Sequence, residues 1–345
     1  MRRYLHFITQ PYSLSVIKPL AELIEKEGWG ENLVFIAPKV RQYYDLRFPY
    51  CTTLREALTY QPEVVFVPGN VVYPRLPGLK VQIFHGICEE KGGHYKITGF
   101  FDLYCTSGPL ITTKFQKLAA RHGYFQVVET GWPKIDALLA PFERTQLLER
   151  LAIPPSHKII LYAPTFSPRF NSSDKILPVI EDLPRFNETW IIKFHDLMQL
   201  PYRQLFHRLP GQHFRIYEHY DNIPLLQLAD VLISDTSSIV YEFILLDKPV
   251  ITLGAKVRLE KGINLQDATQ LRASLDRVLT NPAEYQAGRA KVIAEIHPYR
   301  DGQNARRVLE AVETKLKSGI RFALKPKPLN LYRKWRVYRQ MKNWL

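Results

Sequence analysis

The chain has 345 residues, 46% of them hydrophobic and 23% charged, a composition that excludes a disordered or collagen-like protein. This length exceeds that of one ordinary compact core, so we expect two domains. Lysine and arginine number 47 against 33 acidic residues, and the net charge of +14 favours an anionic partner, whether nucleic acid, acidic lipid or a phosphorylated substrate.

Residues 1–150 alternate between short apolar strands and helices. Strands are expected over 3–8, 33–37, 64–68, 80–84, 103–106 and 126–129, and helices over 14–26, about 52–60 and 109–121. This alternation predicts a doubly wound, Rossmann-like α/β domain, in which helices cover both faces of a parallel sheet.

The pair Pro154-Pro155 interrupts the chain, and the same pattern then begins again. Strands are expected over 158–163, 189–194, 213–217, 231–234 and 249–253, with helices between them. From about 265 to 316 the sequence is helical, but it does not reveal on which domain this stretch packs. We therefore expect two Rossmann-like domains, residues 1–150 and 151–317, facing each other across a cleft, and a basic helical tail, residues 318–345.

The three cysteines, Cys51, Cys88 and Cys105, are odd in number and show no CxxC spacing. This pattern argues against a disulfide framework or a zinc cluster and favours the cytosol. The apolar stretch near Met1 is too short for a signal peptide, and no run of 18 apolar residues is present to span a bilayer. If the protein meets a membrane, we expect it to do so from one side.

The last part of the chain, from Lys315 to Leu345, carries ten Lys or Arg and no acidic residue. Apolar residues recur in it at helical spacing, namely Leu331, Trp335, Tyr338, Met341 and Leu345. Such a helix predicts binding to an anionic membrane surface, but a helix packed on the fold with its basic side chains in solvent fits the pattern equally well. Nucleic acid is not expected as a partner, because no recognised binding module accompanies the tail.

A polar turn, Asp235-Thr236-Ser237-Ser238, follows the expected strand 231–234 and precedes an expected helix. Backbone N–H groups, small hydroxyls and the positive end of a helix dipole converge at such a turn, which suits a pyrophosphate. The same residue types are also the preferred N-caps of helices, so capping alone is the competing explanation.

One histidine follows an expected strand in each half, His85 after 80–84 and His195 after 189–194. Open parallel sheets bind ligands at the carboxyl ends of their strands, where an imidazole could deprotonate an attacking hydroxyl. A lone histidine at such a place is more often structural, but one in each half is harder to dismiss. Thr165 also follows an expected strand, and Lys91 precedes a glycine pair in the loop after His85.

The chain contains no GxGxxG, Walker A, CxxC, HExxH, GxSxG or Asp-x-Asp motif. Their absence weakens the dehydrogenase, P-loop, zinc-enzyme and serine-hydrolase classes. We expect no dedicated cofactor or metal site, although a magnesium ion carried by the phosphates of a donor would leave no signature in the sequence.

Taken together, the order and spacing of these segments resemble the bacterial CDP-glycerol glycerophosphotransferases, the teichoic-acid polymerases and primases with GT-B architecture. The resemblance covers roughly residues 80–310. It rests on His85-Gly86 with Lys91, Gly131-Trp-Pro-Lys-Ile-Asp136, Leu161-Tyr-Ala-Pro-Thr-Phe166, Lys193-Phe-His195, and the stretch from Leu228 to Phe243 followed by Lys248-Pro249.

The resemblance implies that His85 is the catalytic base of an acceptor domain and that His195 holds the phosphates of the donor or stabilises the departing nucleotide. Other residues implied in donor binding are Thr165, Lys193, Asp235, Thr236, Ser237 and Ser238, with Gly86 and Lys91 in an acceptor loop. The implied reaction moves glycerol phosphate from CDP-glycerol to a hydroxyl of a glycan or lipid-linked acceptor and releases CMP. It implies a cytoplasmic protein at the inner face of the cell membrane.

Two departures from the family pattern leave the donor open. The chain has Lys193-Phe-His-Asp196 where the family usually has Lys-Pro-His-Pro, and Asp235-Thr-Ser-Ser where it has Asp-Tyr-Ser-Ser. CDP-ribitol or a sugar nucleotide is therefore an alternative donor. A sugar-nucleotide glycosyltransferase or 2-epimerase of the same fold, and a non-catalytic protein that binds an anionic polymer or a membrane, are the competing functions. The oligomeric state is not predicted.

Overall fold

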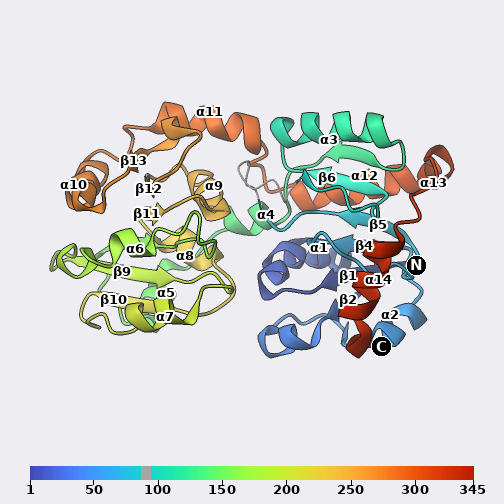
Figure 1. Cartoon of the computed structure of the whole chain (residues 1–345), viewed down its shortest axis with the longest axis horizontal. Helices are drawn as coiled ribbons and strands as arrows, with labels where there is room; N and C mark the ends of the chain where they lie inside the picture. The colour runs from blue at the N-terminus through green and yellow to red at the C-terminus, as the bar shows by residue number, and fades with distance from the viewer. Residues whose placement is uncertain (87–94) are drawn as a thin grey trace. The chain divides into compact units, whose positions relative to one another are not determined.

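The computed structural model describes residues 1–86 and 95–345, and its contacts divide the chain into two compact units (Figure 1). Among the described residues, unit 1 comprises Met1–His85, 95–137 and Glu295–Leu345, and unit 2 comprises Gly86 and Leu138–Ala294. These units differ from the predicted domains: residues 138–150 lie in unit 2, and the chain from Glu295 onward packs on unit 1.

Unit 1 is built around a seven-stranded parallel sheet with the order β3-β2-β1-β4-β5-β6-β7. Its strands are β1 (Arg2–Ile8), β2 (Gly30–Ile36), β3 (Tyr50–Cys51), β4 (Val64–Val67), β5 (Leu79–Gln82), β6 (Leu103–Thr106) and β7 (Gln126–Glu129). The helical connections are η1 (Pro11–Ser13), α1 (Leu14–Lys26), η2 (Pro38–Tyr43), α2 (Leu54–Thr59), α3 (Pro109–His122) and α4 (Lys134–Leu138). The strand order reverses between β1 and β4, and such a switch point is where open α/β sheets bind ligands.

The helix α12 (Asn304–Lys317), which was predicted in the second domain, belongs to unit 1. One face of this helix is buried, and Glu313 accepts a hydrogen bond from the Tyr4 hydroxyl at 3.0 Å and pairs with Arg2 at 2.6 Å. Both partners belong to β1, so α12 covers the sheet of unit 1. The boundary predicted at residue 317 is corrected by these contacts.

The tail contains α13 (Ile320–Ala323), α14 (Leu331–Gln340) and η7 (Lys342–Trp344). Val337 and Met341 are buried in the core of unit 1, and the Tyr338 ring lies edge-on to Tyr73 with centroids 5.5 Å apart. The tail is therefore packed on the fold along one side of α14.

Unit 2 contains a six-stranded parallel sheet with the order β10-β9-β8-β11-β12-β13. Its strands are β8 (Lys158–Tyr162), β9 (Glu188–Lys193), β10 (Phe214–Tyr217), β11 (Val231–Ser234), β12 (Val250–Leu253) and β13 (Ile263–Leu265). The helices are α5 (Arg144–Arg150), α6 (Ser173–Ile176), η4 (Ile180–Asp182), α7 (Leu200–Phe206), α8 (Ile223–Leu228), α9 (Ser238–Ile244), η5 (Leu259–Lys261), η6 (Ala268–Gln270), α10 (Leu271–Thr280) and α11 (Gln286–Ile296). Here the switch point lies between β8 and β11.

Two doubly wound parallel sheets were predicted, and both are present. The central strands β4, β8 and β11 are apolar and buried on both faces, as expected for parallel strands under two layers of helices. Cys51 and Cys105 are buried free thiols, and burial raises the pKa of each to about 12, so both stay protonated. Among the described residues, no helix combines the length and apolar character required to cross a bilayer.

Candidate functional site

The predicted donor residues of unit 2 lie at the carboxyl ends of three neighbouring strands. β9, β8 and β11 are adjacent, and their registers pair Leu161 with Ile191 and Tyr162 with Ile233. The chain leaves these strands at His195, Thr165 and Asp235 respectively. The structure therefore brings these three predicted residues to one edge of one sheet.

Asp235 ties two of these strand ends together. Its carboxylate accepts hydrogen bonds from the backbone N–H of Thr165 at 3.0 and 3.1 Å, and from the backbone N–H and the hydroxyl of Ser172 at 3.0 Å each. Asp235 is 2% exposed and Thr165 is fully buried. This geometry makes the Asp235 carboxylate an anchor for the loop after β8.

The hydroxyls of Ser237 and Ser238 are the more accessible part of the polar turn, because both residues are half-buried whereas Thr236 is buried. Ser237 occupies the N-cap of α9 with extended backbone angles, yet within the described chain its side chain makes no capping hydrogen bond. Side-chain capping by Ser237, the competing explanation of this turn, is therefore not observed. α9 itself has only seven residues.

The hydrogen on the His195 ring can be placed from its hydrogen bond. The backbone N–H of Leu197 donates to Nδ1 of His195 at 3.1 Å, so in the neutral ring the hydrogen is on Nε2. The ring packs against Phe166 with centroids 4.4 Å apart, and Arg203 donates to the His195 carbonyl at 3.2 Å. Lys193 is buried and its ammonium donates to the Phe194 carbonyl at 2.8 Å.

His85 shows the opposite arrangement at the switch point of unit 1. Its Nδ1 lies 3.2 Å from the carbonyl oxygen of Pro68, which follows β4. Because a carbonyl oxygen only accepts, Nδ1 carries a hydrogen, and in the neutral ring the lone pair is then on Nε2. The ring also packs against Tyr12, which follows β1, with centroids 5.5 Å apart. Gly86 is buried, and Lys91 lies outside the described residues.

Comparison with known proteins gives one family. A model of the family described as CDP-Glycerol:Poly(glycerophosphate) glycerophosphotransferase matches residues 91–257, just under half of the chain. The resemblance to this family is confirmed. The teichoic acid glycerol-phosphate primase of Bacillus subtilis (strain 168) is 28% identical over 171 residues, which are 45% of this chain and 43% of the relative. The match thus spans less than half the length of that relative.

Solved structures show the fold that goes with this family. The wall teichoic acid polymerase TagF has a TM-score of 0.71 at 13% identity, covering 92% of this chain and 90% of that chain. A putative UDP-N-acetylglucosamine 2-epimerase from Listeria monocytogenes has a TM-score of 0.67 at 15% identity. An S. aureus MnaA-UDP co-structure has a TM-score of 0.66 at 15% identity. Both matches cover 95% of this chain and 99% of the solved chain. Identities this low show the fold alone, two parallel-sheet domains of GT-B type.

The segment that matches the glycerophosphotransferase family contains every predicted donor residue of unit 2, from Thr165 to Ser238. His85 and Gly86 precede it. The residues that were not predicted are those that hold the site, above all Ser172. Nothing in the sequence signals that Ser172 contacts Asp235, which lies 63 positions further on.

No group of three or more His, Cys, Asp or Glu side chains is placed to hold a metal ion within residues 1–86 and 95–345. A magnesium ion brought by the phosphates of a donor stays a prediction, because such an ion needs few protein ligands.

Proposed function

We propose that this chain transfers glycerol phosphate, or a similar polyol phosphate, from a CDP-activated donor to a hydroxyl of a glycan or lipid-linked acceptor. The observation that carries the proposal is the different partner of Nδ1 in the two histidines, each at the carboxyl edge of a sheet: a carbonyl oxygen for His85 and a backbone N–H for His195. In the neutral rings these partners place the hydrogen on Nδ1 of His85 and on Nε2 of His195. The match of residues 91–257 to the glycerophosphotransferase family supplies the class of donor.

In this reaction the acceptor oxygen attacks the phosphorus that bears glycerol. The new P–O bond forms the phosphodiester, the P–O bond to the CMP phosphate breaks, and CMP leaves with the bridging oxygen. His85 takes the proton of the acceptor hydroxyl on Nε2, whose lone pair is set by the contact of Nδ1 with Pro68. Positioning of the two reactants and exclusion of water supply the remaining rate enhancement.

The donor phosphates are bound by unit 2. His195 donates a hydrogen bond from Nε2, and the hydroxyls of Ser237 and Ser238 supply two more donors that spread the charge of the leaving group. Asp235 has a different part in this proposal from the one predicted. It positions Thr165 and the loop after β8, since its carboxylate accepts hydrogen bonds from that loop and would repel a phosphate.

Two solved relatives bear on the donor. The TagF polymerase has been solved after a soak with CDPG, with a TM-score of 0.70 to this chain, and this favours a CDP-activated polyol. The MnaA structure contains UDP, which favours the alternative of a sugar-nucleotide enzyme. A thermal-shift screen across CDP, UDP and GDP compounds separates the two, because at equal concentration the ligand that binds the folded protein more tightly stabilises it more.

The decisive experiment measures CMP release from CDP-glycerol in the presence of candidate acceptors, with His85→Gln and His195→Gln in parallel. A glutamine amide cannot act as a base, so His85→Gln should lower kcat by about 100-fold or more. The amide N–H can replace Nε2–H, so His195→Gln should retain about a tenth of the activity. His207→Gln, at the end of α7, is the matched control. Wild-type activity in His85→Gln, or no release with any CDP donor, overturns the proposal.

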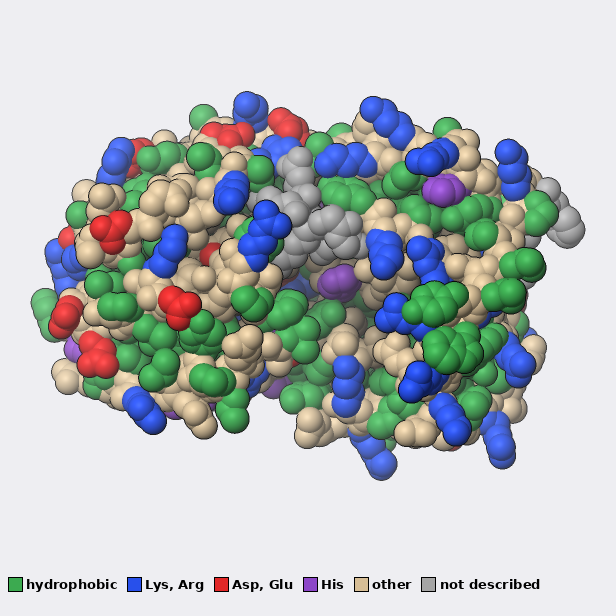
Figure 2. Space-filling view, viewed as in Figure 1, with side chains coloured by type: hydrophobic (Ala, Val, Ile, Leu, Met, Phe, Trp, Pro, Cys, Tyr) green, Lys and Arg blue, Asp and Glu red, His purple; other side chains and the backbone are tan. Residues whose placement is uncertain are grey.

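We also propose that the tail holds the protein peripherally at the inner face of the cell membrane. On the part of unit 1 where α14 lies, hydrophobic side chains stand among Lys and Arg side chains (Figure 2). The side chains of Leu331, Tyr332 and Trp335 are between 53% and 70% exposed, whereas Tyr338 and Met341 of the predicted stripe pack on the core. Arg339 lies over the Trp335 ring at 5.5 Å. Aromatic residues flanked by basic ones suit the headgroup region of an anionic bilayer.

Sedimentation with vesicles of equal phosphatidylcholine and phosphatidylglycerol tests the tail. Replacing Tyr332 and Trp335 by Ala should weaken binding about tenfold without unfolding the protein, because both side chains are exposed. Binding of the wild type should also weaken with salt. Phe186→Ala removes an even more exposed aromatic from unit 2 and is the control. Unchanged binding of the double variant contradicts this part of the proposal.

A further inference from the structure

The residue before His85 has an unusual backbone. Phe84 has φ of +58°, in the left-handed region that bulky side chains avoid. Its ring is fixed in the core of unit 1, where it lies edge-on to Phe115 with centroids 5.3 Å apart. The direction in which His85 leaves the end of β5 depends on these backbone angles, so whatever holds Phe84 also orients His85.

The Phe84 carbonyl is held by a single indole. The Nε1–H of Trp132 donates to the carbonyl oxygen of Phe84 at 3.2 Å. Trp132 is 1% exposed, and its backbone N–H donates to Nε2 of His297 at 2.9 Å. His297 is therefore a neutral acceptor in this structure, with its hydrogen on Nδ1. Three residues far apart in the sequence thus form a continuous hydrogen-bonded path that ends one residue before His85.

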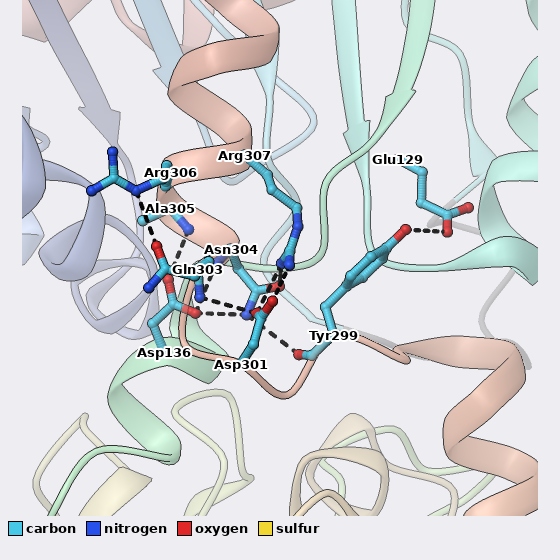
Figure 3. Close-up of polar contacts among 9 residues, drawn as sticks. All are labelled: Glu129, Asp136, Tyr299, Asp301, Gln303, Asn304, Ala305, Arg306 and Arg307. Atoms are coloured by element: carbon cyan, nitrogen blue, oxygen red, sulfur yellow. Dashed lines mark hydrogen bonds and ion pairs between the residues drawn. The ribbon is translucent and has the colours of Figure 1, made fainter.

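His297 belongs to the segment that carries the chain back from unit 2 into unit 1. This segment forms hydrogen bonds with residues of unit 1 that precede Trp132 in the sequence and with residues that follow it. The Ser107 hydroxyl donates to the Ile296 carbonyl at 3.1 Å, and Asp136 accepts the backbone N–H groups of Asn304 and Ala305 at 3.0 and 2.7 Å (Figure 3). The Tyr299 hydroxyl donates to Glu129 at 2.7 Å.

Glycine is required for this close approach. A Cβ on Gly108 would overlap the Ile296 carbonyl, and a Cβ on Gly131, which has φ of +77°, would overlap the Asn304 side chain. The returning segment therefore fits against the loop that carries Trp132 with no space between them.

We propose that Trp132 is a positioning residue for His85, which it orients by holding the Phe84 carbonyl, and that His297 in the returning segment fixes Trp132. This inference rests on the proposed function of His85 as the base. The alternative is that Trp132 only fills the core of unit 1. The two explanations differ in what they require of Trp132. A positioning role requires the indole N–H, whereas core filling requires only the ring.

The first test is Trp132→Phe, which keeps an aromatic ring and removes the donor. We expect kcat for CMP release to fall about tenfold with KM for CDP-glycerol within about twofold of wild type, as when an interaction matters only for the transition state. In a His85→Gln background the same substitution should change kcat by less than about twofold, because effects through one residue are not additive. Equal losses in both backgrounds overturn the proposal.

Matched variants separate the N–H from the ring. Trp190→Phe alters a fully buried indole of unit 2 whose Nε1 has no hydrogen-bond partner among the described residues, and it should leave kcat unchanged. His297→Gln retains an acceptor for the Trp132 backbone N–H and should retain activity, whereas His297→Leu should resemble Trp132→Phe. Loss of activity in Trp190→Phe equal to that in Trp132→Phe indicates core packing instead.

The second test does not depend on turnover. In ¹⁵N spectra of the histidine rings, the signals absent from His85→Gln identify His85. In the wild type they should show hydrogen on Nδ1 and a lone pair on Nε2, and in Trp132→Phe they should move toward an average of the two tautomers. Unchanged signals overturn the positioning role even if CMP release is confirmed. If the wild type releases no CMP, the proposed function fails, and these spectra still decide whether Trp132 orients the ring.

Discussion

The two units secure their strand-end loops by different means. In unit 2 a buried carboxylate, Asp235, accepts the hydrogen bonds of a loop that reaches from Thr165 to Ser172. In unit 1 the loop before His85 depends on neutral nitrogens, the indole of Trp132 and the imidazole of His297. A buried charge is costly to leave unpaired, whereas a neutral ring accepts a hydrogen bond only while it stays unprotonated. The stability of unit 2 should therefore fall when the charge of Asp235 is removed, and the stability of unit 1 should fall when the pH is lowered.

The largest stability effect should come from Asp235→Ala. The substitution leaves the N–H groups of Thr165 and Ser172 buried without their acceptor, so we expect the free energy of unfolding to fall by about 3 kcal/mol. The thermal shift produced by a CDP-activated donor should also disappear, since the loop after β8 is released. Urea unfolding measures the first effect. The exposed Asp182→Ala should change it by less than about 0.5 kcal/mol, and an equally small change in Asp235→Ala would show that the carboxylate is not an anchor.

Acidification should weaken unit 1 through two buried histidines. Burial lowers the pKa of His6 and of His297 to about 4, whereas an unfolded histidine titrates near 6.5. Between these values the unfolded chain binds protons that the folded chain does not, so the stabilisation is complete above pH 6.5 and is lost as the pH falls toward 4. At pH 4.5 each histidine should account for about 2 kcal/mol of the loss relative to pH 7.5.

Urea unfolding at both pH values, with wild type and His297→Gln, measures this loss. The variant should show a difference between pH 7.5 and 4.5 that is smaller by about 2 kcal/mol, because glutamine does not titrate. The same comparison with Trp190→Phe, which removes no titratable group, should match the wild type. An identical pH dependence in His297→Gln would mean that the unit 1 network does not depend on a neutral ring.

The layout of the fold could be predicted from the sequence because buried parallel strands are short, continuous and apolar. β4 and β11 were recognised in this way, whereas β3 has only two residues and leaves no pattern. Since the carboxyl ends of parallel strands share one edge, the placement of His195, Thr165 and Asp235 at one edge followed from the strand assignments.

The supporting contacts could not be predicted, because they join distant segments. His297 lies 165 positions from Trp132, and Glu313 lies 309 positions from Tyr4. The helical spacing of α12 indicates an apolar face but not the sheet that covers it, which is why the predicted boundary at 317 was wrong. In the tail the spacing gave a helix but did not separate Met341, which is buried, from Leu331, which is exposed.

Of the substitutions that test how the two units hold their loops, Ser172→Ala should lower the free energy of unfolding least. The substitution removes the hydroxyl that donates to Asp235 at 3.0 Å and contacts the Tyr162 hydroxyl at 2.9 Å, but it keeps both backbone N–H donors of the loop. We expect a loss of about 1 kcal/mol in urea unfolding, because each of the two lost hydrogen bonds contributes at least about 0.5 kcal/mol, with the exposed Ser156→Ala as control. A loss as large as that in Asp235→Ala would mean that the hydroxyl, and not the backbone, is the main partner of the carboxylate. Unit 2 would then depend on one side-chain donor, as unit 1 depends on the indole N–H of Trp132.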